Sequence, residues 1–199
     1  VAALALAHVD RICLALGKYP ELAAILEQRV LATEDNLELV DLYARLGEVY
    51  EVQLGQVDDS IRAYRKIFDG LEKSHEGAIE ALGRLYADQG FPDLAIRVLR
   101  SGLDVAIPRT DEQAQLYHIL GTIQQEQGNH AAAVESYRAA LDILPGMPDA
   151  LFFIGWTYAL MDNREEAIRY LELYVAGAGA NAPEHYVRAA QTKLTQLQL

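Results

Sequence analysis

Four segments of this chain repeat one spacing of residues, in which two large side chains precede a glycine and a third follows it. The spacing is large-x-x-large-Gly-x-x-large, and about a dozen residues later each copy has a small residue followed by a large one. A unit of this length is a helical hairpin whose apolar face cannot be buried within one copy, so copies must stack. The pattern therefore predicts an all-α solenoid with an extended concave surface. The copies are Tyr43, Leu46, Gly47, Tyr50 with Ser60 and Tyr64; Ile79, Leu82, Gly83, Tyr86 with Ala95 and Leu99; Tyr117, Leu120, Gly121, Gln124 with Ala133 and Tyr137; and Leu151, Ile154, Gly155, Tyr158 with Ala167 and Leu171.

The glycine in the middle of each predicted first helix indicates a close crossing between two helices. A glycine within a helix costs about 1 kcal/mol relative to alanine, and a crossing that a side chain would block explains why it recurs. In the fourth copy the second helix has Ala167 and Leu171 four residues apart, on one face. We expect the small Ala167 to face Gly155, with Leu171 beside it.

The intervals between the glycines are close to the length of one known repeat. Gly47 to Gly83 spans 36 residues, Gly83 to Gly121 spans 38, and Gly121 to Gly155 spans 34. The tetratricopeptide repeat has a period of about 34 residues. The chain resembles that family over most of its length and most clearly from Gln115 to Tyr174. The resemblance implies a right-handed superhelical solenoid of antiparallel helix pairs.

This resemblance implies about five hairpins and a capping helix in a single solenoid. The copy around Gly47 departs from the family, because Ser60 replaces the expected alanine and one extra residue lies between Tyr50 and Ser60. The last helix is polar, as expected of a helix that covers the open end of a stack. Within residues 1–199 we expect repeats at 1–32 (degenerate), 37–70, 76–106, 112–145 and 148–176, and the capping helix at 183–198.

Several helix ends are also marked in the sequence. The segment from Thr110 to Gln113 fits a capping box, and Pro148 suits the first turn of a helix. Gly90 and Gly128 fit the tight links between paired helices, where a left-handed backbone conformation favours glycine.

The net charge of −12 is divided equally, with −6 in residues 1–100 and −6 in residues 101–199. There is no basic run, which argues against a nucleic-acid partner and against direct contact with an anionic membrane. The only cysteine, Cys13, has apolar helical neighbours, so we expect a buried structural thiol. No stretch is long and apolar enough to span a bilayer. Because the chain begins with Val1, we expect a fragment or processed product; the compartment stays open, with the cytoplasm favoured.

The sequence contains no pattern of catalytic residues. It has no phosphate-loop motif and no Gly-x-Ser-x-Gly, and the glycines near residue 178 form a linker rather than a dinucleotide fingerprint. Histidines in a zinc-protease motif would be four residues apart, and no pair here has that spacing. We therefore expect no enzymatic activity, no cofactor and no metal site. The histidines are His8, His75, His118, His130 and His185.

In the tetratricopeptide family the first helix of each hairpin lines the concave groove. The exposed stripe of each first helix must avoid the packing stripe and keep helical spacing. Three copies present polar groups there, whereas the fourth presents aromatic side chains, which are frequent in binding hot spots. Two interpretations of Trp156 remain open, since it could anchor a partner or pack beneath the C-terminal helix. The candidate groove residues are Phe152, Phe153, Trp156, His118, Thr122, Arg84, Glu80 and Glu48.

The resemblance also allows one kind of partner to be argued against. Chaperone-binding members of the family hold a terminal carboxylate with Lys, Arg and Asn side chains on successive first helices. Here the matching stripe has Glu48, Glu51 and Glu80, with Arg84 as its clear cation, so a carboxylate would be repelled. We expect a scaffold that binds a peptide or helix of a partner protein with apolar anchors and basic flanks. The alternatives are self-assembly into a homo-oligomer, through the apolar end near Phe152–Leu160 or through an exposed terminal repeat, and regulation within a larger protein.

Overall fold

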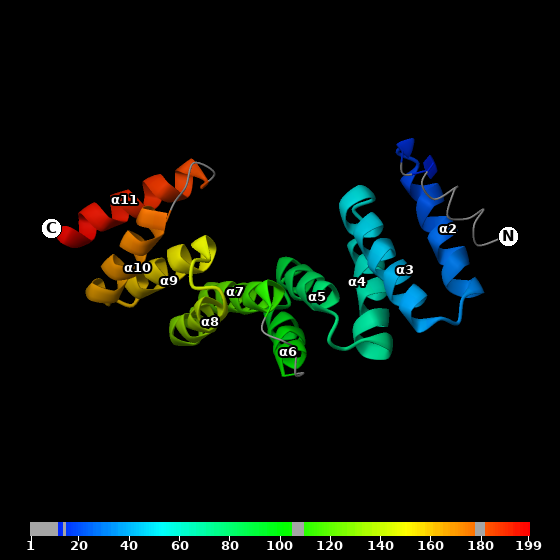
Figure 1. Cartoon of the computed structure of the whole chain (residues 1–199), viewed down its shortest axis with the longest axis horizontal. Coiled ribbons are helices and arrows are strands. Elements are labelled where there is room, and N and C mark those ends of the chain that lie inside the picture. Colours follow the sequence, from blue (N-terminus) through cyan, green and yellow to red (C-terminus); the bar gives the residue numbers. More distant parts are fainter. Residues whose placement is uncertain (1–11, 14, 105–109, 178–181) are drawn as a thin grey trace. The chain divides into compact units, whose positions relative to one another are not determined.

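The structure, a computed structural model, describes residues 12, 13, 15–104, 110–177 and 182–199. All the regular secondary structure of these residues is helical (Figure 1), which confirms the all-α fold class. The predicted first hairpin lies in part outside the described residues. The helices are α2 (Tyr19–Ala32), α3 (Asn36–Glu48), η1 (Val49–Gln53), α4 (Val57–Lys66), η2 (Ile67–Leu71), α5 (Glu76–Asp88), α6 (Pro92–Leu103), α7 (Asp111–Glu126), α8 (His130–Ile143), α9 (Pro148–Leu160), α10 (Arg164–Gly177) and α11 (Glu184–Gln198).

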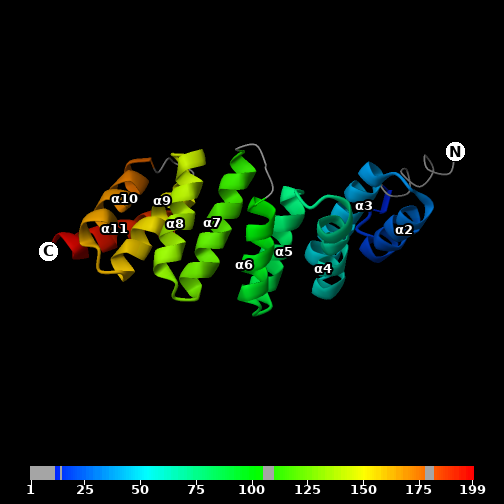
Figure 2. The same ribbon diagram turned by 90° about the horizontal axis from the view of Figure 1, so that it is seen from below.

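The chain divides into two compact units, with the boundary inside α5. Unit 1 ends at Leu85 and unit 2 begins at Tyr86. Within each unit, each helix turns back beside the one before it, which is the arrangement of stacked hairpins (Figure 2). The single solenoid expected over residues 1–199 stays a prediction.

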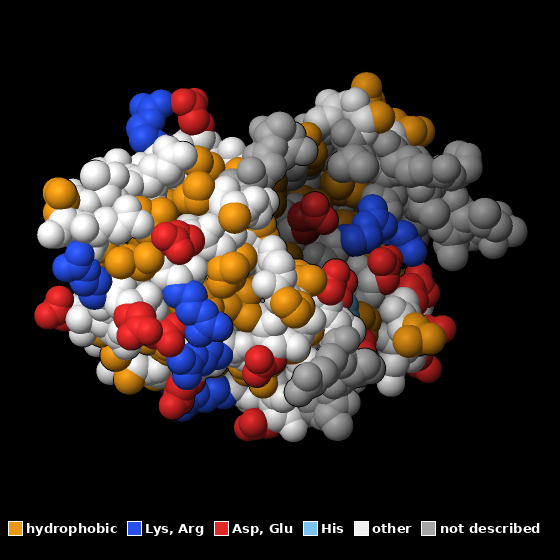
Figure 3. Space-filling view, turned by 60° about the vertical axis from the view of Figure 1, so that its left-hand side comes forward, with side chains coloured by type: hydrophobic (Ala, Val, Ile, Leu, Met, Phe, Trp, Pro, Cys, Tyr) orange, Lys and Arg blue, Asp and Glu red, His pale blue; other side chains and the backbone are white. Residues whose placement is uncertain are grey.

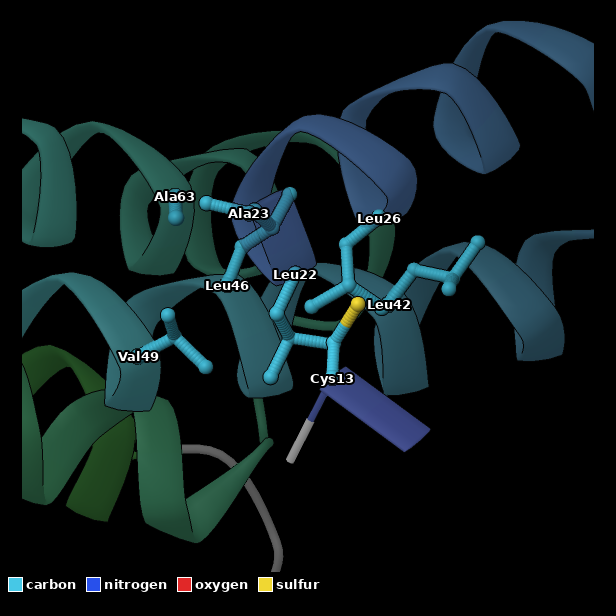
Figure 4. Packing of buried hydrophobic residues seen from close by; sticks show 8 residues of the cluster. All are labelled: Cys13, Leu22, Ala23, Leu26, Leu42, Leu46, Val49 and Ala63. Atoms are coloured by element: carbon cyan, nitrogen blue, oxygen red, sulfur yellow. The ribbon is translucent and has the colours of Figure 1, made fainter. Parts of the chain in front are cut away.

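The core of unit 1 lies where α3 packs against both α2 and α4. Leucines from α2 and α3 meet there, and Leu26 and Leu42 are fully buried (Figure 4). Cys13 packs against the same leucines with its thiol buried and free, as predicted. This cluster shows how each helix hides its apolar face against its neighbours. Its members are Cys13, Leu22, Ala23, Leu26, Leu42, Leu46, Val49 and Ala63.

The extra residue of the copy around Gly47 is absorbed by a π-helical turn. η1 continues α3 with a wider hydrogen-bond pattern, in which the amide of Leu54 donates to the carbonyl of Val49, five residues back, at 3.1 Å. Gly55, the left-handed link (φ 64°), therefore comes eight residues after Gly47. In the other three copies the left-handed residue comes seven positions after the helix glycine, and these links are Gly90, Gly128 and Asp162.

Ser60 stands where the family has alanine because its hydroxyl has a partner. The side chain is fully buried, and its Oγ donates to the carbonyl of Gly47 at 2.9 Å. The bond joins α4 to α3 just before α3 passes into η1. A buried polar group is tolerated when it is hydrogen-bonded in this way.

Replacing Ser60 by alanine should lower the free energy of unfolding by about 1 kcal/mol, the usual net value of one buried hydrogen bond. Urea denaturation followed by circular dichroism measures the change. Thr195→Ala in α11 is the matched control, because its exposed hydroxyl makes a similar bond to the carbonyl of Gln191 at 3.0 Å. The control should change stability by less than about 0.5 kcal/mol, and equal losses in both variants would remove this explanation of Ser60.

In unit 2, α7 packs against α8, α8 against α9, and α9 against α10. Tyr137 of α8 is fully buried between Ala133 of the same helix and Ile154 and Tyr158 of α9. α11 then packs on α10 and α9 (Figure 1). Ala190 is the residue of α11 that is fully buried. The polar helix expected at 183–198 therefore covers the last hairpin on one side only.

The helix glycines make close crossings, but the residue that faces them differs from the prediction. A Cβ built on Gly155 would lie 2.9 Å from Cγ of Leu171, and one on Gly121 would lie 2.7 Å from Cε1 of Tyr137. We predicted that Ala167 would face Gly155, and this was wrong. The large side chain lies directly over the glycine, because only the absence of a Cβ leaves room for it.

Four predicted signals at helix ends are confirmed. The hydroxyl of Thr110 accepts a hydrogen bond from the amide of Gln113 at 3.1 Å, as expected of a residue that caps α7. Pro148 occupies the first turn of α9. Gly90 and Gly128 have φ values of 79° and 75°, which a residue with a Cβ adopts only with strain.

Candidate functional site: the first-helix face

The first helix of each hairpin contributes to one face of its unit, which we call the first-helix face. In unit 1 this face comprises α3 with η1 and the part of α5 that ends at Leu85, and in unit 2 it comprises α7 and α9. The candidate groove residues predicted from helical spacing belong to these elements. The structure decides which of them are accessible to a partner.

In unit 1 the structure brings together acidic side chains from two successive first helices around the hydroxyl of Tyr64. The ring of Tyr64, from α4, crosses Gly47 of α3, where a Cβ would lie only 2.5 Å from Cζ of the ring. The pKa of Tyr64 is raised to about 12, chiefly by burial; the carboxylates of Glu51, Glu48 and Glu80 add to this rise, and Arg84 opposes it. The glycine thus allows the tyrosine ring to reach across α3 toward the first-helix face.

One cation lies among these carboxylates. Arg84 of α5 pairs with Glu51 of η1 at 2.5 Å, and Glu51 is the more buried partner, with 15% of its side chain exposed. Glu48 is exposed and Glu80 is half-buried. Three carboxylates and one guanidinium leave this part of the face with a local excess of negative charge.

The raised pKa of Tyr64 predicts an alkaline loss of stability that Tyr64→Phe should reduce. An unfolded tyrosine releases its proton near pH 10, whereas folded Tyr64 keeps it until about pH 12. The stabilising effect is complete below pH 10 and is lost as the pH rises through 12, because the unfolded state ionises first. Between pH 9 and pH 12 the stability of the variant should rise relative to wild type by about 1–3 kcal/mol. Denaturant titrations at several pH values measure this, and parallel curves would contradict the assignment.

In unit 2 a second tyrosine hydroxyl meets polar side chains of α7. The hydroxyl of Tyr137 lies 3.4 Å from Oγ1 of Thr122 and 3.3 Å from Oε1 of Gln125. The same Gln125 oxygen accepts a hydrogen bond from the hydroxyl of Thr157 on α9, and Thr157 also lies 2.7 Å from the carbonyl of Phe153. Two successive first helices are thereby joined by a polar network on the first-helix face.

His118 is buried beside this network. Its ring contacts those of Tyr137 and Phe153, with centroids 5.7 and 5.5 Å away. Neither ring nitrogen has a hydrogen-bond partner among the described residues. Burial lowers the pKa of His118, and the nearby carboxylate of Asp149 opposes this shift. The imidazole is therefore a neutral part of the wall, and with 9% exposed it offers little surface to a partner.

Phe152, which we predicted to be exposed, is instead covered by α11. Only 6% of it is exposed, and its ring lies 4.8 Å from that of Tyr186 and 5.3 Å from that of Tyr174. Phe153 is half-buried, and the centre of its ring lies 6.0 Å from that of Tyr186. The physical reason lies in α9, which is apolar on all sides after Asp149 and must therefore be covered on more than one face.

Trp156 packs against α11, as one of the two interpretations left open by the sequence expected. Its ring stacks on Phe152 at 5.7 Å, and the ammonium group of Lys193 on α11 lies 5.5 Å from the ring centre. Part of the Trp156 side chain nevertheless stays exposed to solvent, and it lines a groove along α11. Whether Trp156 and the other candidate side chains contact a partner stays a prediction.

Helical spacing alone did not identify Tyr64, Tyr137 and Thr157 as parts of this face. The two tyrosines belong to second helices, which the stripe on the first helices excludes. A signal existed, since each tyrosine is opposite a helix glycine, and a large ring in that place must extend past the first helix. The basic residues of α11 were also missed, because that helix was considered only as a cap.

Charged side chains of both signs lie among one another on the face that Figure 3 shows, with apolar side chains in patches between them. Among the described residues, several arginines pair with nearby carboxylates, as Arg169 does with Glu166 at 3.3 Å. Within the described ranges, no three His, Cys, Asp or Glu side chains are grouped so that they could hold a metal ion. No helix in the described part of the chain has both the length and the apolar character needed to cross a bilayer.

Several solved structures have a similar fold. The crystal structure of MamA matches with a TM-score of 0.72 and 23% identity over 85% of this chain and 94% of that one. PilW, a type IV pilus biogenesis factor, matches with a TM-score of 0.71 and 14% identity, and the match covers 99% of this chain and 86% of that one. YrrB is described as a tetratricopeptide repeat protein with an unusual peptide-binding site. It matches with a TM-score of 0.69 and 18% identity, and the match covers 92% of this chain and 88% of that one. Because all three identities are below 25%, these likenesses show the fold alone.

Sequence comparisons lead to the same family. Human (Homo sapiens) tetratricopeptide repeat protein 7B is 26% identical over 149 residues, which are 74% of this chain and 16% of that protein. The chain therefore spans about one sixth of the length of this curated relative. Two sequence models of the tetratricopeptide repeat match residues 76–146 and 125–194, and together they cover more than half of the 199 residues. The chain belongs to the tetratricopeptide repeat family.

Proposed function

We propose that this chain is a non-catalytic protein-interaction scaffold that binds a peptide or helix of a partner protein along the first-helix face. The observation that carries the proposal is the row of polar groups on this face. In unit 1 the hydroxyl of Tyr64 lies among carboxylates from two successive first helices. In unit 2 the hydroxyl of Tyr137 meets side chains of α7, and Gln125 of that helix is bonded in turn to Thr157 of α9. Rows of this kind suit an extended partner segment. The peptide-binding site named for YrrB supports the same kind of function.

The charges on the face of unit 1 favour basic side chains in the partner. The negative charge of Glu48, Glu51 and Glu80 is larger than the positive charge of Arg84. Part of this cluster is half-buried, and charge pairs there are screened less than in open water. A lysine or arginine of the partner would relieve the repulsion among these carboxylates. Complementary charges of this kind also raise association rates and discriminate between partners.

Selection from a random peptide library displayed on phage tests the proposal without a known partner. Peptides selected on the wild-type chain should be enriched in Lys and Arg with large apolar residues between them. They should bind at least about tenfold more weakly to Glu48→Lys/Glu80→Lys, because the variant reverses two charges on the first-helix face. Fluorescence polarisation of the labelled peptides measures these affinities.

The matched control is Glu21→Lys/Glu72→Lys, which makes the same change in net charge at two exposed positions outside this face. It should keep the affinity within about threefold, since exposed charges elsewhere act weakly. If both double variants lose binding equally, the peptides recognise net charge. If neither loses binding, the face of unit 1 is not the site.

Self-association is the second candidate, and exposed apolar side chains at the end of α9 favour it. Leu160 is 52% exposed and Met161, which follows it, is 42% exposed. Apolar groups left open to water can mark a contact between proteins. Size-exclusion chromatography with light scattering at tens of micromolar should then show a dimer that Leu160→Asp dissociates. A monomer of the wild-type chain under those conditions would remove this candidate.

A further inference from the structure

The groove between α9 and α11 is lined by basic side chains, whereas the face of unit 1 has an excess of acidic ones. It is a cavity of about 540 Å³ whose lining comes from Trp156 and from one side of α11. On α11 the lining residues recur at three, four and seven positions from His185, which is one helical stripe. The lining contains no aspartate and no glutamate. Its residues are Trp156, His185, Arg188, Ala189, Thr192, Lys193 and Gln196.

The cations of this groove are available for a new partner. Lys193 makes no ion pair with any residue that the structure describes, and its ammonium group lies over the indole of Trp156. Arg188 pairs with Glu184 at 2.6 Å, but 74% and 86% of these two side chains are exposed. Such exposed pairs contribute little to stability and exchange partners readily. In a chain with a net charge of −12, a groove with this lining is a local reversal of charge.

The indole at the edge of the groove is held in place from beneath. Trp156 stacks on Phe152 with an angle of 24° between the rings, and Phe152 is fixed in turn by Tyr174 and Tyr186. A rigid, half-buried tryptophan beside cations provides an apolar contact next to a site for negative charge. The amide of Gln196 adds a hydrogen-bonding group along the same groove, whereas the hydroxyl of Thr192 already donates to the carbonyl of Arg188 at 2.9 Å.

We infer that the groove between α9 and α11 binds an acidic peptide segment, with an apolar side chain of the segment on Trp156 and carboxylates beside Lys193 and Arg188. The inference rests on the proposed scaffold function and extends it with a second subsite of opposite charge in unit 2. A nucleic acid is the less favoured occupant. The groove supplies few cations, and acidic and basic side chains are interspersed on the face that Figure 3 shows.

Tryptophan fluorescence reports on this groove directly, because Trp156, which lines it, is the single tryptophan of the chain. The probe is a capped peptide of about ten residues, with leucines set among glutamates and no aromatic residue. It should change the fluorescence of Trp156 in a saturable way, and the same peptide with lysines in place of glutamates should not do so at tenfold higher concentration. Equal responses to the two peptides would overturn the inference. It would also be overturned if a thymidine oligonucleotide bound more tightly than the glutamate peptide.

Variants locate the binding in the groove. Lys193→Glu combined with Arg188→Gln should weaken the glutamate peptide at least about tenfold, whereas Lys193→Arg should stay within about threefold. Lys73→Glu combined with Lys18→Gln makes the same change in net charge at two exposed positions of unit 1; it is the matched control and should have no effect. Unchanged affinity in the double variant would overturn the inference. Peptides selected for the face of unit 1 should still bind that variant, so this failure and failure of the proposed scaffold function are distinguishable.

Discussion

Replacing Tyr137 by alanine should lower the free energy of unfolding by about 3–5 kcal/mol, the usual cost of removing a large buried aromatic side chain. Tyr137 is fully buried in unit 2, where it packs against Ile154 and Tyr158. Its ring also fills the space over Gly121, so its loss leaves a cavity along the crossing of α7 and α8. Urea denaturation followed by circular dichroism measures the change.

Tyr137→Phe separates the ring from the hydroxyl. The hydroxyl contacts with Thr122 and Gln125 are long, at 3.4 and 3.3 Å, so their removal should cost less than about 1.5 kcal/mol. A loss in Tyr137→Phe as large as that in Tyr137→Ala would show that the polar network, rather than the ring, holds the crossing together. A loss below 1 kcal/mol in Tyr137→Ala would contradict the packing seen in unit 2.

The second large effect is expected for Gly155→Leu, which should destabilise the chain by roughly 3 kcal/mol through overpacking. The added Cβ would lie 2.9 Å from Cγ of Leu171 and 3.0 Å from its backbone nitrogen. A side chain can rotate away, but the backbone of α10 must move as a whole. The better helix propensity of leucine offsets only about 1 kcal/mol of this cost.

Gly177→Leu is the matched control for this substitution. Gly177 is the last residue of α10, and a Cβ there would meet no other atom within 4 Å. The control should leave stability within about 1 kcal/mol of wild type. Similar melting curves for Gly155→Leu and the wild-type chain would mean that the glycine does not serve a close helix crossing.

The fold could be predicted because the pattern records how helices pack. Glycines at intervals of 34 to 38 residues located the helix crossings, and the residue types at Thr110 and Pro148 located helix starts. The partner at each crossing was misjudged, since spacing does not say whether a small or a large side chain lies over the glycine. Contact distances at Gly121 and Gly155 show that the large one does.

The candidate site could be predicted only in part. Helical spacing placed Glu48, Glu80 and Thr122 on first helices correctly, because a helix face depends only on the period of the helix. It could not show that α11 covers Phe152, because that contact depends on how the chain returns after α10. The continuous apolar character of α9 was the available indication that this helix is buried on several sides.

The most direct test of the scaffold is to map where a selected peptide binds. Nuclear magnetic resonance of the isotope-labelled chain, at 22.0 kDa, resolves amide signals helix by helix. On addition of the peptide, we predict that the shifted signals belong to the first-helix face of a unit, which is carried by α3, η1 and α5 up to Leu85 in unit 1 and by α7 and α9 in unit 2. Shifts confined to the second helices α4, α8 and α10 would contradict the central claim.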